Sequence, residues 1–414
     1  MTTSPVAICE DPDVHEGPAL LSGLGSAPSL VAHREQYGDV PRVALDDLRD
    51  AVDGVGLRGR GGAAFPFAVK LRTAAEGSRR PVVVVNLSEG EPASSKDSAL
   101  ARTRPHLVLD GAVATARALG AHQVHVVLPG DRPLTRSAMA AAMAERRDRR
   151  VRLVQHVATP HFVAGQARAV LELIAGRPNL PVTAWTPEAV SGHRSRPTLL
   201  SNAETWAHVG RLLHAGPPAG LGTADEPGTS LLTLRLPGAR VAVREVPFGT
   251  SLGSLLPEGD VPVLLGGFHG TWTTSAAARQ LRVSVPGLRD AGCAWGAGLV
   301  LAVDDCPVTW TQRIVAYLAG QSARRCGPCL NGLPALSTAV SALDDGEGTA
   351  RIEELTTLVE RRGACAHPDG TVRLVRSLLA TYPLEVDRHG ADTCSWTGPR
   401  VVRRLPRRIG SVAS

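Results

Sequence analysis

The chain has 414 residues, which is too long for one ordinary hydrophobic core and therefore predicts two or three domains. Its apolar fraction of 43% is that of a globular protein, and the lack of any run of about 18 apolar residues argues against a membrane-spanning helix. Arginine supplies nearly all of the basic charge behind the net +6, and no aromatic stacking platform or helix-turn-helix pattern accompanies it, so we expect no nucleic-acid partner.

The first half of the chain alternates between strand-like and helix-like segments. After a loosely organised beginning with a short helix at 45–52, β-branched runs predict buried strands at 81–86, 123–128 and 151–157. Helices are expected between the strands, at 67–75, 107–119 and 135–147. Such alternation is typical of a parallel sheet in an α/β domain.

The second half changes from loop to strand to helix. Residues 176–198 are rich in Pro, Gly and Arg and predict a long surface loop, and residues 215–229 predict a linker. Short strands are expected within a small β-rich domain, at 231–236, 241–246 and 261–267. From residue 309 onward the pattern becomes helical, with helices expected at 311–319, 332–343, 351–360 and 372–381.

A glycine-rich loop at 54–66 is suited to holding a phosphate. Glycines let backbone N–H groups approach an anion without Cβ clashes, and the helix expected after the loop adds a favourable dipole. Lys70, one turn into that helix, can neutralise the phosphate and is one of only two lysines, with Lys96. The spacing matches neither the Rossmann nor the Walker A pattern, so the loop alone is equally compatible with a flexible surface turn.

Polar residues follow the first predicted strand directly. Asn86, Ser88, Glu89 and Glu91 stand at its carboxyl end, which is where open α/β sheets bind their ligands. Two acids in a solvated turn would be unremarkable, but beside a glycine-rich loop they favour a ligand site.

These segments resemble, in order, the motifs of the NADH-binding flavoprotein subunit of respiratory complex I, whose family includes diaphorase subunits of NAD-linked hydrogenases and formate dehydrogenases. Residues 56–66 followed by Lys70 resemble the FMN loop of that family, and residues 197–205 resemble its Asn-Asn-Val-Glu-Thr motif. Residues 245–250 and 264–270 resemble its small β-grasp domain, often called the soluble-ligand-binding β-grasp.

The resemblance implies an α/β fold with three parts. A Rossmann-like FMN-binding domain is expected at 50–214, followed by a β-grasp domain at 228–275 and a C-terminal helical bundle that carries an iron–sulfur site at 309–395. The remaining segments are an N-terminal extension, a connecting segment and a basic tail, at 1–49, 276–308 and 396–414. The five arginines in 400–408 predict either a docking arm for an acidic partner or, with greater weight, a solvated tail.

The same resemblance implies roles for individual residues. The FMN would lie against residues of the loop and the strand ends, namely Gly59, Arg60, Gly61, Gly62, Lys70, Asn86, Ser88, Glu89, Gly165 and Asn202. Phe65 would stack on the nicotinamide dinucleotide, and Glu91 would act as the catalytic-site residue that hydrogen-bonds its carboxamide.

Three positions depart from the family pattern. The family has Gly-Glu-Glu where this chain has Gly165-Gln166-Ala167, Asp where Ser88 stands, and an aromatic residue where Thr73 stands. Because a missing carboxylate changes the hydrogen bonds to dinucleotide or flavin, we expect the FMN site to be better kept than the NADH site.

The cysteines indicate a metal site in the C-terminal third, where six of the seven lie. Cys326-Gly-Pro-Cys329 is a CxxC motif, and Cys365 follows after a helical hairpin. A redox-motif interpretation lacks its thioredoxin-like context, and zinc remains open because His367 lies near Cys365. Thiolates at a helix start with a distant third thiolate suit an iron–sulfur cube better.

By the resemblance, the first of four cluster ligands is replaced by Ala323. Cys326, Cys329 and Cys365 remain as ligands of a [4Fe-4S] cluster, and we take Cys394 as the best candidate for the fourth, with Cys306 or a non-cysteine group as alternatives. A three-iron cluster or the loss of the cluster also stays open. Cys9 and Cys293 are interpreted as ordinary thiols.

The sequence therefore predicts an electron-transfer oxidoreductase that takes electrons from NADH through FMN to an iron–sulfur cluster. The alternative is a non-catalytic FMN-binding or electron-relay subunit that has lost NADH oxidation. Expected partners are other redox subunits, such as a ferredoxin-like or thioredoxin-like iron–sulfur protein. Residues 1–30 lack a basic segment followed by an apolar core, so we expect no signal peptide, a cytoplasmic location and membrane association only through partners.

Overall fold

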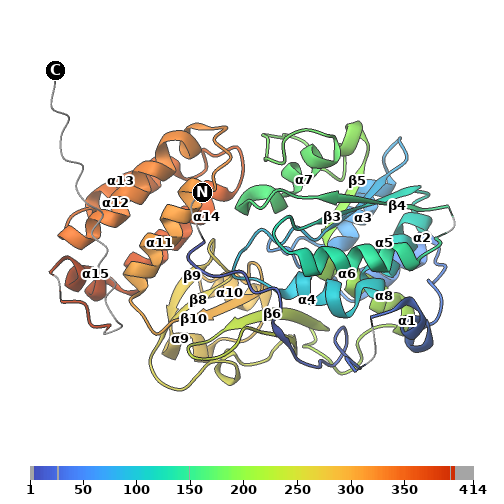
Figure 1. Cartoon of the computed structure of the whole chain (residues 1–414), viewed down its shortest axis with the longest axis horizontal. Coiled ribbons are helices and arrows are strands. Elements are labelled where there is room, and N and C mark those ends of the chain that lie inside the picture. Colours follow the sequence, from blue (N-terminus) through green and yellow to red (C-terminus); the bar gives the residue numbers. More distant parts are fainter. Residues whose placement is uncertain (1–3, 26–27, 149, 392, 397–414) are drawn as a thin grey trace.

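Three structural parts lie side by side in the computed structural model, which describes residues 4–25, 28–148, 150–391 and 393–396 (Figure 1). A parallel α/β domain lies at the right of the view, a mixed sheet at the lower centre and a group of helices at the left. The predicted basic tail lies outside the described residues. Among the residues described, no helix has both the length and the apolar character needed to span a membrane.

The α/β domain is built on a four-stranded parallel sheet with strand order β4-β3-β2-β5. Three strands confirm the predicted positions, namely β2 (Val82–Asn86), β3 (Gln123–Leu128) and β4 (Arg152–Val157). The four valines of β2 are almost fully buried, as expected for a central parallel strand. The fourth strand, β5 (Thr198–Asn202), begins where the predicted loop ends and pairs so that Asn202 lies opposite Asn86.

Helices cover this sheet. They are α1 (Leu30–Tyr37), α2 (Leu45–Gly54), α3 (Phe67–Ala75), α4 (Lys96–Thr103), α5 (Pro105–Ala118), α6 (Pro133–Glu145), α7 (Ala167–Ile174) and α8 (Ala203–Ala215). Helices α5 and α8 approach each other closely, and a Cβ added at Gly111 would lie 2.0 Å from the carbonyl oxygen of Trp206. Only glycine fits there, so the two backbones pack directly against each other.

The second sheet has the order β1-β7-β6-β10-β8-β9. Its strands are β1 (Asp13–Val14), β6 (Thr229–Arg235), β7 (Ala242–Pro247), β8 (Pro262–Leu265), β9 (Thr271–Thr274) and β10 (Leu299–Ala302). The hairpin of β6 and β7 lies beside the last strand, with β6 and β10 parallel, which is the arrangement of a β-grasp domain. Helices α9 (Ser275–Gln280) and α10 (Val285–Asp290) belong to the same part.

Two of the predicted boundaries need correction. The segment 276–308, expected as a connection, supplies β10 in the middle of the β-grasp sheet, because that strand is too short and apolar to stand out from its surroundings. The N-terminal extension supplies β1 at the sheet edge, and the buried carboxylate of Glu245 accepts hydrogen bonds from the backbone N–H groups of residues 19–21. The extension is thus fastened to the β-grasp domain.

The C-terminal helices confirm the helical expectation. They are α11 (Pro307–Gly320), α12 (Leu333–Ser341), α13 (Thr349–Val359), α14 (His367–Thr381) and α15 (Pro383–Gly390). Trp272 of β9 joins them to the β-grasp sheet, since its indole N–H donates to Thr311 Oγ1 at 2.8 Å and its backbone N–H donates to Ser377 Oγ at 2.9 Å.

Candidate functional site

The glycine-rich loop leaves α2 and returns to the start of α3 as a closed turn. The backbone N–H of Gly59 donates to the carbonyl of Phe65 at 2.8 Å, and that of Phe67 donates to Leu57 at 2.8 Å. Gly62 has φ +104°, a conformation that favours glycine, and its missing side chain faces the carbonyl of Gly296 at 3.4 Å. The loop is therefore held as a rigid shelf rather than as a flexible surface turn.

A cavity of about 330 Å³ opens over this shelf, within the size range of small-molecule sites. Gly59, Arg60, Gly62 and Ala64 form one wall, and residues 285–296 with Arg373 form the other. The opposite wall was missed by sequence reasoning, which treated residues 276–308 as a connection; the glycines at 292, 296 and 298 were the available signal. Phe65, predicted to stack on the dinucleotide, is 46% exposed on the same loop.

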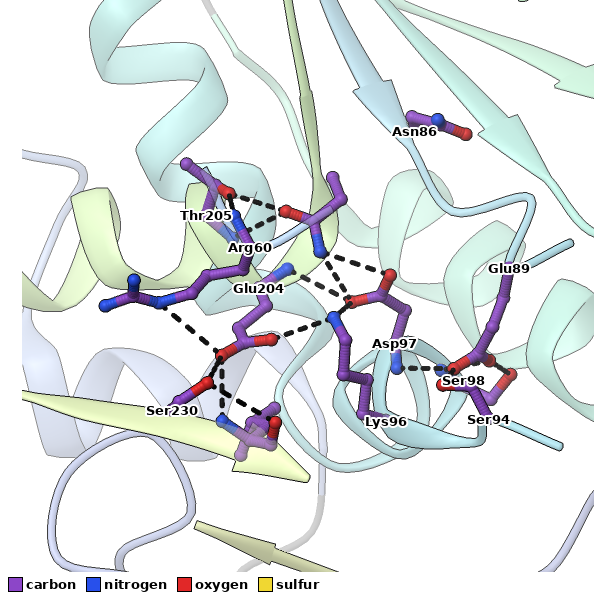
Figure 2. A network of polar contacts seen from close by, with 12 residues as sticks. Arg60, Asn86, Glu89, Ser94, Lys96, Asp97, Ser98, Glu204, Thr205 and Ser230 are labelled. Carbon is purple, nitrogen blue, oxygen red and sulfur yellow. Dashed lines mark hydrogen bonds and ion pairs between the residues drawn. The ribbon is translucent and has the colours of Figure 1, made fainter. Parts of the chain in front are cut away.

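Arg60 is buried and its polar groups are occupied by protein partners. Its backbone N–H donates to Thr205 Oγ1 at 2.9 Å, its guanidinium donates to the carbonyl of Thr229, and its side chain lies 4.7 Å from the ring of Phe248. The guanidinium also faces Glu204 at 3.8 Å (Figure 2). Arg60 thus fastens the loop to the β-grasp strand β6.

Lys96, the second lysine noted in the sequence, lies at the centre of a buried ionic network (Figure 2). Its ammonium group contacts Glu204 Oε2 at 2.8 Å and Asp97 Oδ1 at 3.1 Å. Burial alone would lower the pKa of Lys96, but these two carboxylates raise it above its ordinary value. Burial would likewise raise the pKa of Glu204, but Lys96 holds it down to about 2. Both groups are therefore charged.

Asn202 and Glu89, both predicted to line FMN, have side chains that serve the protein framework. Asn202 begins α8, where its Oδ1 accepts from Thr205 and its Nδ2 donates to Asp97 at 3.2 Å. The Glu89 carboxylate accepts the backbone N–H groups of Asp97 and Ser98 at the start of α4 and pairs with Arg132 at 2.8 Å. These two residues fix the strand ends, and a cofactor would meet their backbone rather than their polar side-chain atoms.

The predicted strand-end residues Asn86, Ser88 and Gly165 are brought together. Asn86 Nδ2 donates to the carbonyl of Gly165 at 2.8 Å, and Asn86 Oδ1 accepts the backbone N–H of Ser88 at 3.2 Å. A Cβ added at Gly165 would lie 2.9 Å from Ser88 Oγ, so the turn at η1 (Phe162–Gly165) packs closely on the end of β2. A carboxylate from Glu188, which sequence reasoning did not single out, lies 3.1 Å from Lys70 Nζ.

Glu91 lies where the strand-end turn meets the β-grasp domain. Its carboxylate accepts the backbone N–H of Phe268 at 2.7 Å and that of Ala93 at 3.2 Å. Burial raises the pKa of Glu91 to about 7, despite those two hydrogen bonds, which favour the charged form. A carboxyl group that titrates near neutral pH is suited to exchanging a proton or hydrogen bond with a ligand.

Cys326, Cys329 and Cys365 lie around the C-terminal end of α11. Burial raises the pKa of the Cys329 thiol to about 12, and the neighbouring thiols of Cys326 and Cys365 act in the same direction. Two contacts hold this region to the end of α11: Ser322 Oγ lies 3.4 Å from the carbonyl of Cys329, and His367 Nε2 lies 2.9 Å from that of Leu318. Three neighbouring thiols fit an iron–sulfur cluster, with the buried Ala323 at the fourth position.

Cys394 requires a correction, because the structure does not place it with these three thiols. It lies instead with Cys306 and His389, the three ligand atoms falling within 4.8 Å of one another. Cys306 precedes α11, whereas the three-thiol cluster is at its other end, and the 14 residues of α11 span about 21 Å. The segment after α15 therefore reaches the wrong end of α11 for Cys394 to complete the cluster.

The residues present fit both expected groups. The glycine shelf supplies backbone N–H groups and open space where a Cβ would intrude on a flavin, and Lys70 with the start of α3 supplies positive charge for its phosphate. Arg289 and Arg373 add positive charge to the cavity wall.

Comparisons with known proteins agree with this geometry. Residues 52–211 match a family model described as the Nuo51 FMN-binding domain, and residues 309–389 match one described as the NADH-ubiquinone oxidoreductase-F iron–sulfur binding region. Together the two models match more than half of the chain.

Curated relatives are similar to the chain over most of their length. It is 26% identical to an NADH-quinone oxidoreductase subunit, of the F type, from Rhizobium meliloti, covering 91% of this chain and 95% of the relative. It is also 26% identical to the NADP-reducing hydrogenase subunit HndC of Solidesulfovibrio fructosivorans, covering 84% and 76%. A crystal structure of an NAD⁺-reducing [NiFe]-hydrogenase in the air-oxidized state superposes with a TM-score of 0.80 at 25% identity, covering 92% of this chain and 68% of that chain.

The fold and site thus define a flavoprotein of the kind found in multi-subunit redox complexes. The chain belongs to the NADH-quinone oxidoreductase-F family, which includes diaphorase subunits of hydrogenases, and it carries that family's FMN-binding domain and iron–sulfur binding region.

Proposed function

We propose that this chain is the NADH:acceptor oxidoreductase component of a larger redox enzyme, and that it binds FMN on the glycine shelf and an iron–sulfur cluster at Cys326, Cys329 and Cys365. The flavin, when bound, accepts hydride from the nicotinamide and releases the electrons one at a time to the cluster. The protein's own residues bind and orient these groups and exclude water.

A single connection carries the proposal. The carbonyl of Gly165 accepts a hydrogen bond from Asn86 at the predicted flavin edge, and the next residue, Gln166, hydrogen-bonds the Cys365 thiol. One step of the backbone therefore joins the flavin site to the cluster site. Electron transfer falls steeply with distance, so this short separation supports direct transfer between the two groups.

Glu91 is placed to serve the nicotinamide side of the reaction. Its position on the backbone of Phe268 ties the strand-end turn to the β-grasp domain, and its carboxylate keeps free acceptor capacity. We infer that it accepts a hydrogen bond from the dinucleotide carboxamide and that Phe65 covers the same ligand.

The proposed acceptor is another redox subunit with a ferredoxin-like or thioredoxin-like iron–sulfur fold. The relatives are named as subunits of larger enzymes, which supports a role within such an assembly. We propose a cytoplasmic location, because the seven cysteines form no disulfide among the described residues and reduced thiols suit a reducing compartment.

The test is anaerobic purification of the full chain, followed by flavin release, iron analysis, and optical and EPR spectra before and after NADH. The proposal expects released FMN rather than FAD, bleaching of the flavin by NADH and a reduced cluster signal. A fully loaded flavin that stays oxidised in NADH but is reduced by dithionite would favour the non-catalytic relay subunit instead. The departures from the family pattern at Gln166 and Ala323 make that alternative worth testing directly.

A further inference from the structure

A second group of metal-ligating side chains lies at the N-terminal end of α11. Cys306, His389 and Cys394 present two sulfur atoms and an imidazole nitrogen, all within 4.8 Å of one another. Tetrahedral zinc with bond lengths of about 2.3 Å to sulfur and 2.0 Å to nitrogen needs donor atoms about 3.5–3.8 Å apart. The observed spacing therefore needs little adjustment to hold such an ion.

The imidazole of His389 is oriented in the way that zinc ligands require. Its Nδ1 lies 2.8 Å from Oδ1 of Asp344, which leaves Nε2 for the metal. Asp344 is itself held by Gln312 Nε2 at 2.7 Å. Metal-binding histidines usually donate their second N–H to a carboxylate in this manner, which fixes the tautomer and raises ligand basicity.

A fourth donor stands next to these three. Glu385 is buried, and its Oε1 lies 4.0 Å from Cys306 Sγ. The backbone N–H of Ser395 donates to the same oxygen at 3.1 Å, which brings the segment after Cys394 against the carboxylate. Residues 397–414 contain no Cys, His, Asp or Glu, so the candidate fourth ligand within the C-terminal region is Glu385 or a water molecule.

We propose that Cys306, His389 and Cys394 bind a structural zinc ion, with Glu385 as the fourth ligand and Asp344 as the positioning residue for His389. Binding replaces the thiol protons of the two cysteines, which are released to solvent. The ion would join the start of α11, the end of α15 and the segment at 393–396, and would thereby anchor the chain that leads into the basic tail. The site is separate from the three-thiol cluster by the length of α11.

The competing possibility is a disulfide between Cys306 and Cys394, whose sulfur atoms are already close. The two outcomes differ in metal content and in thiol number. A zinc site holds metal in the native protein and yields two alkylatable thiols after denaturation in chelator, whereas a disulfide gives neither.

The experiment uses the full chain purified anaerobically and dialysed against metal-free buffer, with zinc and iron measured together. The proposal expects about one zinc per chain, lost in Cys306→Ser, Cys394→Ser and His389→Gln but retained in the control Cys293→Ser. Iron and FMN should stay at wild-type levels in all four variants, which separates this site from the function proposed above. Asp344→Asn should weaken zinc affinity about 10–100-fold against a competing chelator.

Cobalt(II) added to the zinc-free wild-type protein provides a second measurement that does not depend on a variant folding. Sulfur-to-cobalt charge-transfer bands and the intense ligand-field bands of a tetrahedral site should appear at one equivalent and disappear with zinc. The proposal is overturned if the wild-type protein holds no zinc and gives no such bands. It is also overturned if a Cys306–Cys394 disulfide is found under anaerobic conditions, or if Cys394→Ser loses iron and zinc together.

Discussion

The side chain of Gln166 hydrogen-bonds the thiol of Cys365 and favours its charged form. Gln166 directly follows Gly165, whose carbonyl accepts from Asn86 at 2.8 Å, so it stands between the predicted flavin edge and the predicted cluster. The family pattern has a glutamate at this position. A neutral amide donor here, in place of an acidic acceptor, is therefore a specific change in the surroundings of a cluster ligand.

Replacing Gln166 by Glu should make the cluster harder to reduce. The change removes a hydrogen-bond donor to the Cys365 sulfur and adds a negative charge, and both effects disfavour the reduced cluster. A hydrogen bond to a charged group contributes about 1.5 kcal/mol, so the reduction potential should fall on the order of 60 mV. A redox titration followed by EPR measures this, with the exposed Gln280→Glu as the control; equal potentials in both variants would mean that Gln166 does not act on the cluster.

Sequence reasoning was most successful where one segment determines its own structure. The valine run of β2 and the helices of the C-terminal region could be predicted because burial on both faces or a helical period is visible locally. Strand β10 was missed because four apolar residues become the centre of a sheet only through pairing with β6 and β8. Long-range pairing of this kind leaves almost no local signal.

The site shows the same division at the level of single residues. Glu91 and the three thiols could be named from motifs, and the structure places Glu91 beside the β-grasp domain and the thiols at one end of α11. Cys394 was misassigned because nearness in sequence to Cys365 says nothing about which end of α11 a later segment reaches. The polar side-chain atoms of Glu89 and Asn202 face the framework, and no local pattern indicated their partners Arg132 and Asp97.

Gly61→Val should abolish flavin retention with little loss of folding. A Cβ at Gly61 would lie 3.7 Å from Asn202 Cβ, which is ordinary contact, so the protein itself tolerates a side chain there. The added methyl groups would instead block the approach of a flavin to the backbone of the shelf. FMN released from purified protein should fall at least about tenfold relative to Gly54→Val, whose side chain meets open space at the end of α2. Wild-type flavin content in Gly61→Val would rule out binding on this shelf.

Glu91→Gln should weaken the response of the flavin to NADH more than it weakens FMN binding. Loss of a buried acceptor for the carboxamide should cost about 1–3 kcal/mol of dinucleotide binding, or roughly 5- to 150-fold in the NADH concentration needed to bleach the flavin. Stopped-flow reduction measures this, with the exposed Glu258→Gln as the control. An unchanged NADH dependence would show that Glu91 makes no such contact.

The raised pKa of Glu91 also predicts a pH dependence of stability. Burial raises this pKa from 4.5 to about 7, so between these values the folded protein binds more protons than the unfolded chain. Stability contributed by the protonated carboxyl is present below about pH 4.5 and is lost as the pH rises through 7. Between pH 5 and 8 the wild-type protein should lose about 2 kcal/mol more of its free energy of unfolding than Glu91→Gln does. Parallel pH profiles for the two proteins would contradict the assignment.

Lys96→Met should destabilise the protein by about 3–5 kcal/mol, because it leaves the buried carboxylates of Glu204 and Asp97 without their cation. Urea unfolding followed by circular dichroism and flavin fluorescence measures the loss. The control Arg351→Met removes the exposed partner of Glu354 and should cost less than about 1 kcal/mol. Similar costs in the two variants would mean that the network in Figure 2 does not hold the loop to the β-grasp domain.

Ala323→Cys should complete the cluster site. Ala323 is buried at the position of the family's first ligand, and the adjacent Ser322 contacts the carbonyl of Cys329, so a thiol added at 323 would lie beside the existing three. With four thiolates, the cluster should gain about one iron per chain and should no longer convert in air to a three-iron form with its distinct EPR signal. The control Ala335→Cys adds a thiol on α12 and should leave iron content and air sensitivity unchanged. If Ala323→Cys binds no more iron than the wild-type chain, a group other than cysteine already fills the fourth position, and the open-site interpretation of this cluster is wrong.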